Sequence, residues 1–484
     1  MKTSEIATIV QGGRVRGPER EFSTLKANSR SVRPGDAFIA LKGSLSDGHT
    51  FVPNAIRAGA SVVICNYGYS ENGTDATVIE VPDTKEALKR LLPILFPCAR
   101  LSKLIAITGT NGKTSITYLI ESILNSASMS SGVIGTINMR YGGVSIPSDV
   151  TTPGPIDLFA QLHTMGLAGV DACVMEVSSH SLDQDRIMGL TYDCAVFTNL
   201  TQDHLDYHKD METYFLAKKK LFSKEYLCGA SVVNADDAYG RRLIRELPDA
   251  VAYGRNDDAD VHIRSLQNTP DGLIMELSSP AGTLPLRSHL RAEINAYNIM
   301  AAVGAVIALG VEKDAIISGI ESLEQVPGRL EPVRNPYGLN ILVDYAHTPD
   351  ALQNVLRSVR SFTKGKLFSI FGCGGDRDKG KRPIMGSIAA EISDHAIITS
   401  DNPRSEEPLA IIDDILKGIA DRSNVSVEPD REQAIRQGVA MMKEHDCLVI
   451  AGKGHETYQI IGSEKKTFDD RECVRKCLRE IYGT

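Results

Sequence analysis

The sequence has no excess of basic residues. Its 53 Lys and Arg are outnumbered by 61 Asp and Glu, and the formal net charge is -8. Proteins that bind nucleic acid by neutralising many phosphates need clustered, surplus cations. We therefore expect no nucleic-acid partner, and any phosphate chemistry must be confined to a local site.

Long apolar runs are also missing. A membrane-spanning helix needs about 18 or more consecutive, mostly apolar residues, and the chain contains no uninterrupted run of that kind. The first residues, Met1 to Gly13, contain no long apolar block such as a secretory signal requires. These absences predict a cytoplasmic protein with no membrane insertion.

Closely spaced metal-binding cysteines are absent as well. The nine cysteines are scattered, and only Cys473 and Cys477 are near one another, without the Cys-x-x-Cys and His pattern of a zinc site. We expect reduced thiols with mostly structural roles. Repeats of a fixed short period and low-complexity tracts are also lacking.

The chain is long enough for several domains. Its 484 residues exceed what one hydrophobic core usually supports, and domains of roughly 100 to 200 residues suggest about three. Pro and Gly punctuate the run Gln325 to Leu330, as is typical of a domain boundary. We expect three domains, at residues 1–99, 100–330 and 331–484.

Short apolar runs alternate with helix-like segments along most of the chain. The expected strands lie near residues 36–41, 60–65, 104–107, 172–175, 195–197, 231–233, 341–343, 367–371, 396–399 and 447–450. Apolar strands that alternate with amphipathic helices favour largely parallel sheets covered on both faces. The expected fold class is therefore α/β.

The sharpest local signal is a glycine-rich loop between an apolar strand and an amphipathic helix, Thr108-Gly109-Thr110-Asn111-Gly112-Lys113-Thr114-Ser115. Glycines let the backbone turn so that its N–H groups face phosphate oxygens, and the helix start adds partial positive charge. Lys113 is placed to reach terminal phosphates, and a hydroxyl can bind magnesium. Only two residues separate the glycines, so the spacing is not that of the general nucleotide loop. An ordinary glycine turn that caps a helix is the alternative.

This loop resembles the shortened Thr-Gly-Thr-Asn-Gly-Lys-Thr loop of the Mur ligase superfamily. Further motifs in the family's order extend the resemblance over most of the chain: Met175-Glu176-Val177-Ser178-Ser179-His180, Thr198-Asn199-Leu200-Thr201-Gln202-Asp203-His204-Leu205-Asp206, Asn295-Ala296-Tyr297-Asn298, Pro327-Gly328-Arg329-Leu330-Glu331 and Asp344-Tyr345-Ala346-His347-Thr348. The resemblance implies a small α/β UDP-binding domain, a central P-loop ATPase domain with a mostly parallel sheet, and a C-terminal Rossmann-like domain that binds an amino acid.

The resemblance also implies a magnesium site and catalytic residues. Magnesium prefers oxygen ligands, so Glu176, after an apolar strand, and the hydroxyl of Thr114 suit it chemically. His204 joins them by resemblance, with an ordinary loop histidine as the alternative. Lys218 lies in the Lys218-Lys219-Lys220 run, where the family has a carbamylated lysine that ligates magnesium; a solvated charged helix face is the alternative. Lys113, Glu176, His204 and Lys218 are the expected catalytic set.

Three ligand sites follow from the same resemblance. The residues expected to bind ATP are Gly109, Thr110, Asn111, Gly112, Lys113, Thr114, Ser115, Asn298 and Asp344. Those expected to bind a UDP-linked muramoyl dipeptide are Ser29, Ser44, Thr151, Thr152, Ser178, Gln184 and Arg186. Those expected to bind the incoming amino acid are Arg377, Asp401, Asn402, Pro403, Arg404, Gly452 and Glu456. The cofactors implied are magnesium and the co-substrate ATP.

The amino acid is indicated by Asp401-Asn402-Pro403-Arg404, which directly follows an apolar strand. Open α/β sheets bind ligands at the carboxyl ends of their strands. The motif matches the family's recognition element for meso-diaminopimelate, which is lysine with a second carboxylate at its far end. The guanidinium of Arg404 offers a planar fork for that carboxylate, whereas a lysine substrate would meet a cation.

The expected reaction is an ATP-dependent amide ligation in peptidoglycan synthesis. ATP would phosphorylate the D-glutamate carboxylate of UDP-N-acetylmuramoyl-L-Ala-D-Glu, and the amine of meso-diaminopimelate would displace the phosphate. Transient contacts with other cell-wall enzymes are a further expectation. A lysine-adding muramoyl ligase and a folylpolyglutamate synthetase-like ligase remain alternatives within the fold. An ATPase switch and a silent binding protein remain alternatives from other classes.

Overall fold

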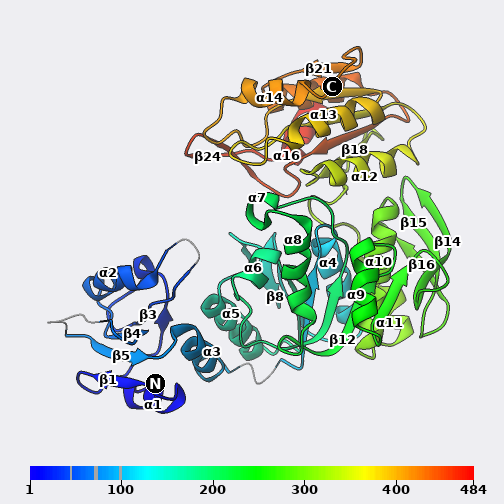
Figure 1. Ribbon diagram of the computed structural model, residues 1–484. Coiled ribbons are helices and arrows are strands. Elements are labelled where there is room, and N and C mark those ends of the chain that lie inside the picture. Colours follow the sequence, from blue (N-terminus) through cyan, green and yellow to red (C-terminus); the bar gives the residue numbers. More distant parts are fainter. Residues whose placement is uncertain (44–45, 70–74, 98–100, 484) are drawn as a thin grey trace. The chain divides into compact units, whose positions relative to one another are not determined.

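A computed structural model describes residues 1–43, 46–69, 75–97 and 101–483 (Figure 1). They divide into two compact units. The first unit comprises Met1–Ala106, Met129–Asp193 and Ala217–Gly229, and the second comprises Ile107–Ser128, Cys194–Leu216 and Ala230–Thr484. The elements β6 (Lys103–Thr108), β11 (Tyr192–Phe197), α8 (Met211–Lys219) and β12 (Leu227–Asn234) have residues in both units.

The first unit begins with a small five-stranded sheet in the order β1-β5-β4-β3-β2. Its elements are α1 (Thr3–Ile9), β1 (Arg14–Arg16), β2 (Leu25–Lys26), η1 (Ser29–Ser31), β3 (Ala37–Ile39), η2 (Gly48–Phe51), α2 (Val52–Arg57), β4 (Val62–Asn66), β5 (Thr77–Val81) and α3 (Thr84–Leu95). Strands β2 to β5 are parallel, and β1 pairs antiparallel with β5. The strands β3 and β5 are buried throughout, as expected for a parallel sheet with both faces covered.

The rest of the first unit surrounds a parallel strand pair. Its further elements are β7 (Ser131–Ile134), β8 (Asn138–Tyr141), β9 (Val144–Pro147), α5 (Pro155–Leu167), β10 (Ala172–Glu176), α6 (Ser179–Asp183) and η3 (Lys220–Phe222). Strands β10 and β7 run parallel, and β8 and β9 continue from β7 as antiparallel strands. Every residue of β10 is buried, so the carboxylate of Glu176, its last residue, is presented from a rigid core strand.

The first part of the second unit joins helices to an antiparallel extension. Its elements are α4 (Lys113–Ser126), α7 (Leu205–His208), α9 (Ala238–Glu246), β13 (Val251–Gly254), β14 (Val261–Thr269), β15 (Gly272–Ser278), β16 (Leu284–Ser288), α10 (Glu293–Ala308) and α11 (Lys313–Ser322). Strands β12, β13 and β14 are parallel, while β15 and β16 are added antiparallel. Helix α4, which begins at Lys113, packs against α10 and α11.

The C-terminal part of the second unit is a doubly wound sheet in the order β17-β18-β22-β19-β20-β21. Its elements are β17 (Glu331–Pro332), β18 (Asn340–Asp344), α12 (Pro349–Arg360), β19 (Leu367–Phe371), α13 (Lys381–Ile392), β20 (His395–Ile398), α14 (Pro408–Leu416), β21 (Val425–Val427), α15 (Arg431–Met441), β22 (Cys447–Ala451), β23 (Tyr458–Ile461), β24 (Glu464–Thr467) and α16 (Asp470–Tyr482). All pairs between β18 and β21 in this sheet are parallel, and β17 is antiparallel.

Alternate side chains of these strands enter two different cores. On β22, Cys447, Val449 and Ala451 pack with α12, α13 and α14, whereas Leu448 and Ile450 pack with α15 and α16. This period of two is what a strand buried on both faces requires. The predicted α/β class with largely parallel sheets is therefore confirmed. The predicted strands at 104–107, 172–175, 367–371 and 447–450 correspond to β6, β10, β19 and β22.

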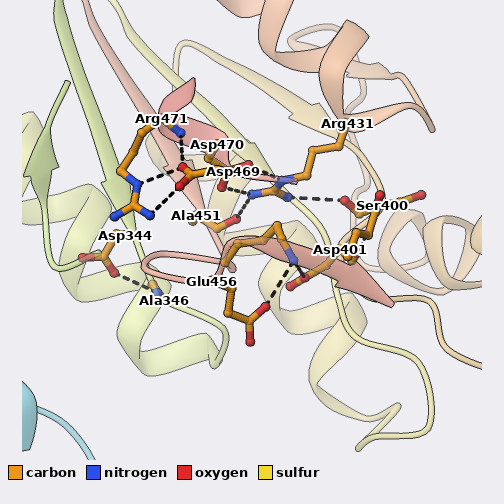
Figure 2. A network of polar contacts seen from close by, with 12 residues as sticks. Asp344, Ala346, Ser400, Asp401, Arg431, Ala451, Glu456, Asp469, Asp470 and Arg471 are labelled. Atoms are coloured by element: carbon orange, nitrogen blue, oxygen red, sulfur yellow. Dashed lines mark hydrogen bonds and ion pairs between the residues drawn. The ribbon is translucent and has the colours of Figure 1, made fainter. Parts of the chain in front are cut away.

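A buried ion pair ties helices α15 and α16 to the carboxyl ends of β20 and β22. Arg431 and Asp470 are 0% exposed at their side chains, and the guanidinium donates to both carboxylate oxygens at 2.7 Å. Figure 2 shows the same guanidinium reaching the carbonyl oxygens of Ala451, at 3.0 Å, and Ser400, at 3.4 Å. Arg431 thus fixes the two strand ends that precede Asp401 and Gly452.

Replacement of Arg431 tests the importance of this pair. Arg431→Met leaves the Asp470 carboxylate buried without its partner, which costs about 3 to 5 kcal/mol in comparable cases. We expect faster hydrogen exchange of the β22 amides, measured in the full chain by mass spectrometry. Arg436→Met is the matched control, because Arg436 pairs with Glu480 between the same two helices but on the exposed surface, where ion pairs contribute little. Equal protection of β22 in both variants would contradict this role.

Candidate active site

The glycine-rich loop connects β6 to α4 and has little room for side chains at its two glycines. Gly109 has φ +145° and Gly112 has φ +90°, a region of backbone conformation that glycine tolerates best. A Cβ atom at Gly112 would clash with the Asn298 side chain, and one at Gly109 would clash with Thr198. Both glycines are therefore required by backbone conformation and by close packing.

The loop is held in place by its own lysine and by neighbouring polar groups. The ammonium of Lys113 donates to the carbonyl oxygens of Gly109, at 2.9 Å, and Thr110, at 2.8 Å. The hydroxyl of Thr114 accepts a hydrogen bond from Arg329 at 3.1 Å. Asn111 donates to Asp350 at 3.1 Å. The cation of Lys113 is thus poised directly over the turn of the loop.

A cavity of about 500 Å³ opens beside this loop. Five of the residues predicted to bind ATP line it: Asn111, Gly112, Ser115, Asn298 and Asp344. They come from the loop, from α10 and from the end of β18. The structure therefore brings together the loop residues and two residues that are far away in the sequence, in a space of the size typical of small-molecule sites.

Asp344 is buried at the carboxyl end of β18. One carboxylate oxygen accepts from the backbone N–H of Ala346 at 2.8 Å, shown in Figure 2, and the other accepts from Leu330 at 2.7 Å. Burial raises the pKa of this carboxyl, while the Arg329 guanidinium and the two N–H groups oppose the shift. These bonds fix the side chain at the wall of the cavity.

Two residues of this region were not predicted from the sequence. Arg329 lies over the ring of Tyr345, 4.8 Å from its centroid, in addition to its bond to Thr114. The carboxylate of Asp350, at the start of α12, accepts a hydrogen bond from the side chain of Asn111 in the loop. The Pro327-Gly328-Arg329 motif was used as a domain boundary and as part of the family resemblance, but no role was assigned to Arg329. Nothing in the sequence pointed to Asp350.

In the first unit, five of the residues predicted to bind the muramoyl dipeptide belong to one hydrogen-bonded group: Thr151, Thr152, Ser178, Gln184 and Arg186. Arg186 donates to the side-chain oxygen of Gln184, at 2.7 and 3.0 Å, and to the carbonyl of Thr152 at 3.0 Å. The Thr152 hydroxyl donates to the carbonyl of Glu176 at 2.9 Å and accepts from the N–H of Ser178 at 3.1 Å. These hydrogen bonds therefore place Thr152, Ser178 and Arg186 close to the carboxyl end of β10.

Thr136 extends this group to Thr151 and to the carboxylate of Glu176. Its backbone N–H and its hydroxyl each donate to Glu176 at 2.9 Å, and its hydroxyl lies 3.1 Å from that of Thr151. Glu176 is only 1% exposed. Carboxylate and hydroxyl oxygens are the ligand atoms that magnesium prefers. The contact of Thr136 with Glu176 was not indicated by the sequence.

The remaining predicted residues are placed in several elements. Ser29 begins the short helix η1, whose N-cap is Asn28, and Ser44 lies outside the described residues. Lys218, on α8, is 1% exposed, which contradicts a solvated face for this lysine. His204 caps α7 in a left-handed conformation with φ 54°. Among the described residues, no group of three or more His, Cys, Asp or Glu side chains is arranged to hold a metal.

The residues predicted to bind the amino acid follow the carboxyl ends of parallel strands in the C-terminal sheet. Asp401, Asn402, Pro403 and Arg404 follow β20, Gly452 and Glu456 follow β22, and Arg377 follows β19. Asn402 donates to the Glu456 carboxylate at 2.9 Å and accepts from the N–H of Ile460 at 2.9 Å. The strand order thus gathers at one edge residues that are up to 79 positions apart, from Arg377 to Glu456.

Arg404 is anchored through its backbone to the neighbouring β23. Its N–H donates to Ile460 at 3.1 Å, and its carbonyl accepts from Gly462 at 2.7 Å. Its φ of 53° lies in the left-handed region. Its guanidinium donates to the carbonyl of Gly375 at 2.8 Å, whereas Arg377 is exposed and donates to Asp376 at 3.1 Å. This edge of the sheet therefore carries both cationic and anionic side chains.

Comparison with family models gives three successive matches. The model described as Mur ligase family, catalytic domain, matches residues 21–106. The Mur ligase middle domain matches residues 107–306, and the Mur ligase, glutamate ligase domain, matches residues 328–454. None of the described helices combines the length and apolar character needed to cross a membrane.

Curated relatives match over nearly the whole chain. A Gloeobacter violaceus protein named UDP-N-acetylmuramoyl-L-alanyl-D-glutamate--2,6-diaminopimelate ligase is 46% identical over 468 residues, which cover 95% of this chain and 94% of the relative. A Clostridium tetani protein of the same name is 40% identical over 490 residues, which cover 100% of both chains.

Solved structures give the same picture at the level of fold. A structure named for the same 2,6-diaminopimelate ligase has 34% identity and a TM-score of 0.68, and the match covers 96% of each chain. A Mycobacterium tuberculosis folylpolyglutamate synthase complexed with ADP has 17% identity and a TM-score of 0.61, covering 75% of this chain and 91% of that one; it shows a shared fold alone. Given the full-length relatives at 40% and 46% identity and the three family models, the chain belongs to the Mur ligase family.

Proposed function

We propose that this chain is an ATP-dependent ligase that joins meso-2,6-diaminopimelate to the D-glutamate carboxylate of UDP-N-acetylmuramoyl-L-Ala-D-Glu. The products are the amide, ADP and phosphate, and the reaction is a step of peptidoglycan precursor synthesis. The full-length relatives that carry this ligase name support the proposal. The single structural observation that supports it is that Asn402, Arg404 and Glu456 follow parallel strands of the C-terminal sheet at the same edge, with Asn402 bonded to Glu456.

The chemistry begins with activation of a carboxylate. A carboxylate is a poor electrophile, so transfer of the γ-phosphoryl group of ATP to its oxygen supplies a leaving group. The cavity beside the glycine-rich loop is of suitable size for the nucleotide, and Lys113 lies at the turn where phosphates would sit. The loop N–H groups and the Lys113 cation are suited to stabilise negative charge on the transferring group.

The second step forms the amide. The amine of diaminopimelate attacks the acyl carbon, its proton leaves, and phosphate departs from the tetrahedral intermediate. The planar guanidinium of Arg404 fits the far carboxylate of diaminopimelate, which lysine lacks. Glu456 is an acceptor for an ammonium group of the same substrate. This arrangement favours diaminopimelate over lysine.

Magnesium fits the residues proposed for it. The buried Glu176 carboxylate and the Thr114 hydroxyl offer oxygen donors, and His204 and Lys218, as a carbamate, are the further proposed ligands. When bound, the ion would neutralise charge on the phosphates of ATP. Lys218 becomes an anion if its amine combines with carbon dioxide and releases a proton, and its burial would keep such a carbamate away from bulk water.

The proposal also includes a division of labour among three parts of the chain. We assign the UDP moiety to residues 1–99, ATP to 100–330 and the amino acid to 331–484, with Ser29, Thr151 and Arg186 among the contacts to the UDP-muramoyl dipeptide. Use of ATP and a UDP-linked acceptor favours the cytoplasm as the place of reaction. Transient association with other cell-wall enzymes is consistent with such a position in a synthesis.

A substrate assay tests the proposal and the role of Arg404 together. With ATP, magnesium and the UDP-muramoyl dipeptide, the unmodified chain should convert diaminopimelate and leave lysine largely unused, as measured by mass spectrometry of the product. Arg404→Met should lower kcat/KM for diaminopimelate about tenfold to a hundredfold, because a charge-assisted bidentate contact is lost. Arg436→Met serves as a surface control. A preference of the unmodified chain for lysine would overturn the assignment.

The tight packing at Gly112 predicts a selective loss of nucleotide binding. Gly112→Ala places a methyl group against Asn298 at the wall of the cavity, so the KM for ATP should rise about tenfold or more. Gly310→Ala is the matched control, since Gly310 has a similar positive φ of +81° but open space around it. An unchanged KM for ATP in Gly112→Ala would count against nucleotide binding at this loop.

Replacement of the buried lysine tests the proposed carbamate. Lys218→Ala should remove most of the ligase activity, and acetate or formate should restore part of it by supplying a carboxylate in the vacated space. Lys220→Ala is the control, because Lys220 is exposed and forms an ion pair with Asp183 at 3.7 Å on the surface. Full activity of Lys218→Ala without added acid would refute the role.

A further inference from the structure

A fully buried lysine lies among the residues proposed to bind the amino acid. Lys453 follows β22 and is 0% exposed. Its ammonium lies 3.1 Å from the side-chain oxygen of Asn402 and 3.1 Å from the carboxylate of Glu456. The carboxylate of Asp401 is 3.7 Å away. One ammonium therefore contacts three of the residues assigned to diaminopimelate, and Lys453 was not among the predicted site residues.

The charges around this ammonium do not balance. Asp401 and Glu456 carry two negative charges against the single positive charge of Lys453, and the Asp401 oxygen nearest to it is buried without a hydrogen-bond partner among the described residues. Burial of an unpaired charge is costly. The cluster therefore has the charge and the acceptor capacity to take one further cation.

The same cluster is continuous with the anchor of Arg404. The side-chain oxygen of Asn402 accepts hydrogen bonds from the Lys453 ammonium and from the backbone N–H of Ile460. The backbone carbonyl of Ile460 in turn accepts from the N–H of Arg404. The Asn402 amide also donates to Glu456 at 2.9 Å. Figure 2 shows Asp401 and Glu456 near one another beside the buried Arg431 pair. A change at Lys453 would act directly on Asn402 and Glu456, but on Arg404 only through Asn402 and the backbone of Ile460.

We propose that Lys453 is a positioning residue that holds Asp401, Asn402 and Glu456 so that they accept the far ammonium of diaminopimelate. The inference rests on the proposed function and deepens it. The two carboxylates and one lysine leave a net negative charge for the substrate ammonium, while Arg404 offers a positive charge for the substrate carboxylate. Lys453 thereby contributes to recognition of the far end of the substrate without touching the reacting atoms.

The test compares two amino acids that differ only in the far amine. The second substrate, 2-aminopimelate, keeps both carboxylates and the attacking amine but has hydrogen in place of the far amine. The unmodified chain should prefer diaminopimelate, and Lys453→Met should reduce that preference, measured as the ratio of kcat/KM values, about tenfold or more. The KM for ATP should stay within about twofold. An equal loss of activity on both amino acids would assign Lys453 a merely structural role and overturn the proposal.

Lys465→Met is the matched control, because Lys465 lies 3.8 Å from the ring of Tyr458, which Lys453 also faces at 5.6 Å, but is exposed. It should leave the preference unchanged. A reduced preference in this control would show that the effect is not specific to the buried ammonium and would also overturn the proposal.

A second comparison covers the case in which Lys453→Met does not fold. The double variant Lys453→Met with Glu456→Gln removes one charge of each sign, and should lose no more preference for diaminopimelate than Glu456→Gln alone, because both act on the same ammonium contact. Additive losses would overturn the proposal. Failure of the unmodified chain to use diaminopimelate would instead refute the proposed function, so the two failures are distinguished.

Discussion

The parallel pairing of β18, β22, β19 and β20 is the constraint on which the candidate amino-acid pocket depends. Strands that run in the same direction end at the same edge, so the loops that follow them meet although they are far apart in the sequence. Loops alone would not hold this geometry. The buried Arg431 guanidinium binds the carbonyls of Ser400 and Ala451 and thereby fixes two of the strand ends from within.

The glycine-rich loop depends on a different kind of constraint, which is close packing. Gly112 lies against Asn298 and Gly109 against Thr198, so a side chain at either glycine would collide with a neighbour. The Lys113 ammonium meanwhile bonds to two carbonyls of its own loop. An incoming anion can replace those carbonyls without refolding of the loop, which reduces the ordering cost of binding.

Much of the fold was predictable because buried parallel strands are short, apolar and bounded by turns. The strands β6, β10, β19 and β22 could be read directly from such runs. The antiparallel strands β14, β15 and β16 were not foreseen. Only the first residue of β14 is buried, and β16 alternates between buried and exposed residues, so neither contains a continuous buried apolar run. The hairpin of β23 and β24 was also missed, because none of its strand residues is buried.

The candidate site likewise contains residues that the sequence could predict and residues that it could not. Motif residues such as Lys113, Glu176 and Arg404 could be named because their chemistry is visible in a short stretch of sequence. Asp350 and Thr136 could not, because their roles arise only from tertiary contacts with Asn111 and Glu176. Lys453 lies between Gly452 and Glu456, which were both predicted to bind the amino acid. The burial of its side chain among carboxylates could not be predicted from the adjacent residues in the sequence.

The left-handed backbone of Arg404 limits how the substrate range of this enzyme can be redesigned. At φ 53°, glycine, asparagine and aspartate are accommodated readily, whereas valine, isoleucine and threonine suffer steric conflict between their branched Cβ and the backbone. A laboratory search for variants that accept a bulkier apolar amino acid would therefore find few productive solutions at this position. Successful designs would have to reshape the surrounding wall and leave the anchoring turn intact.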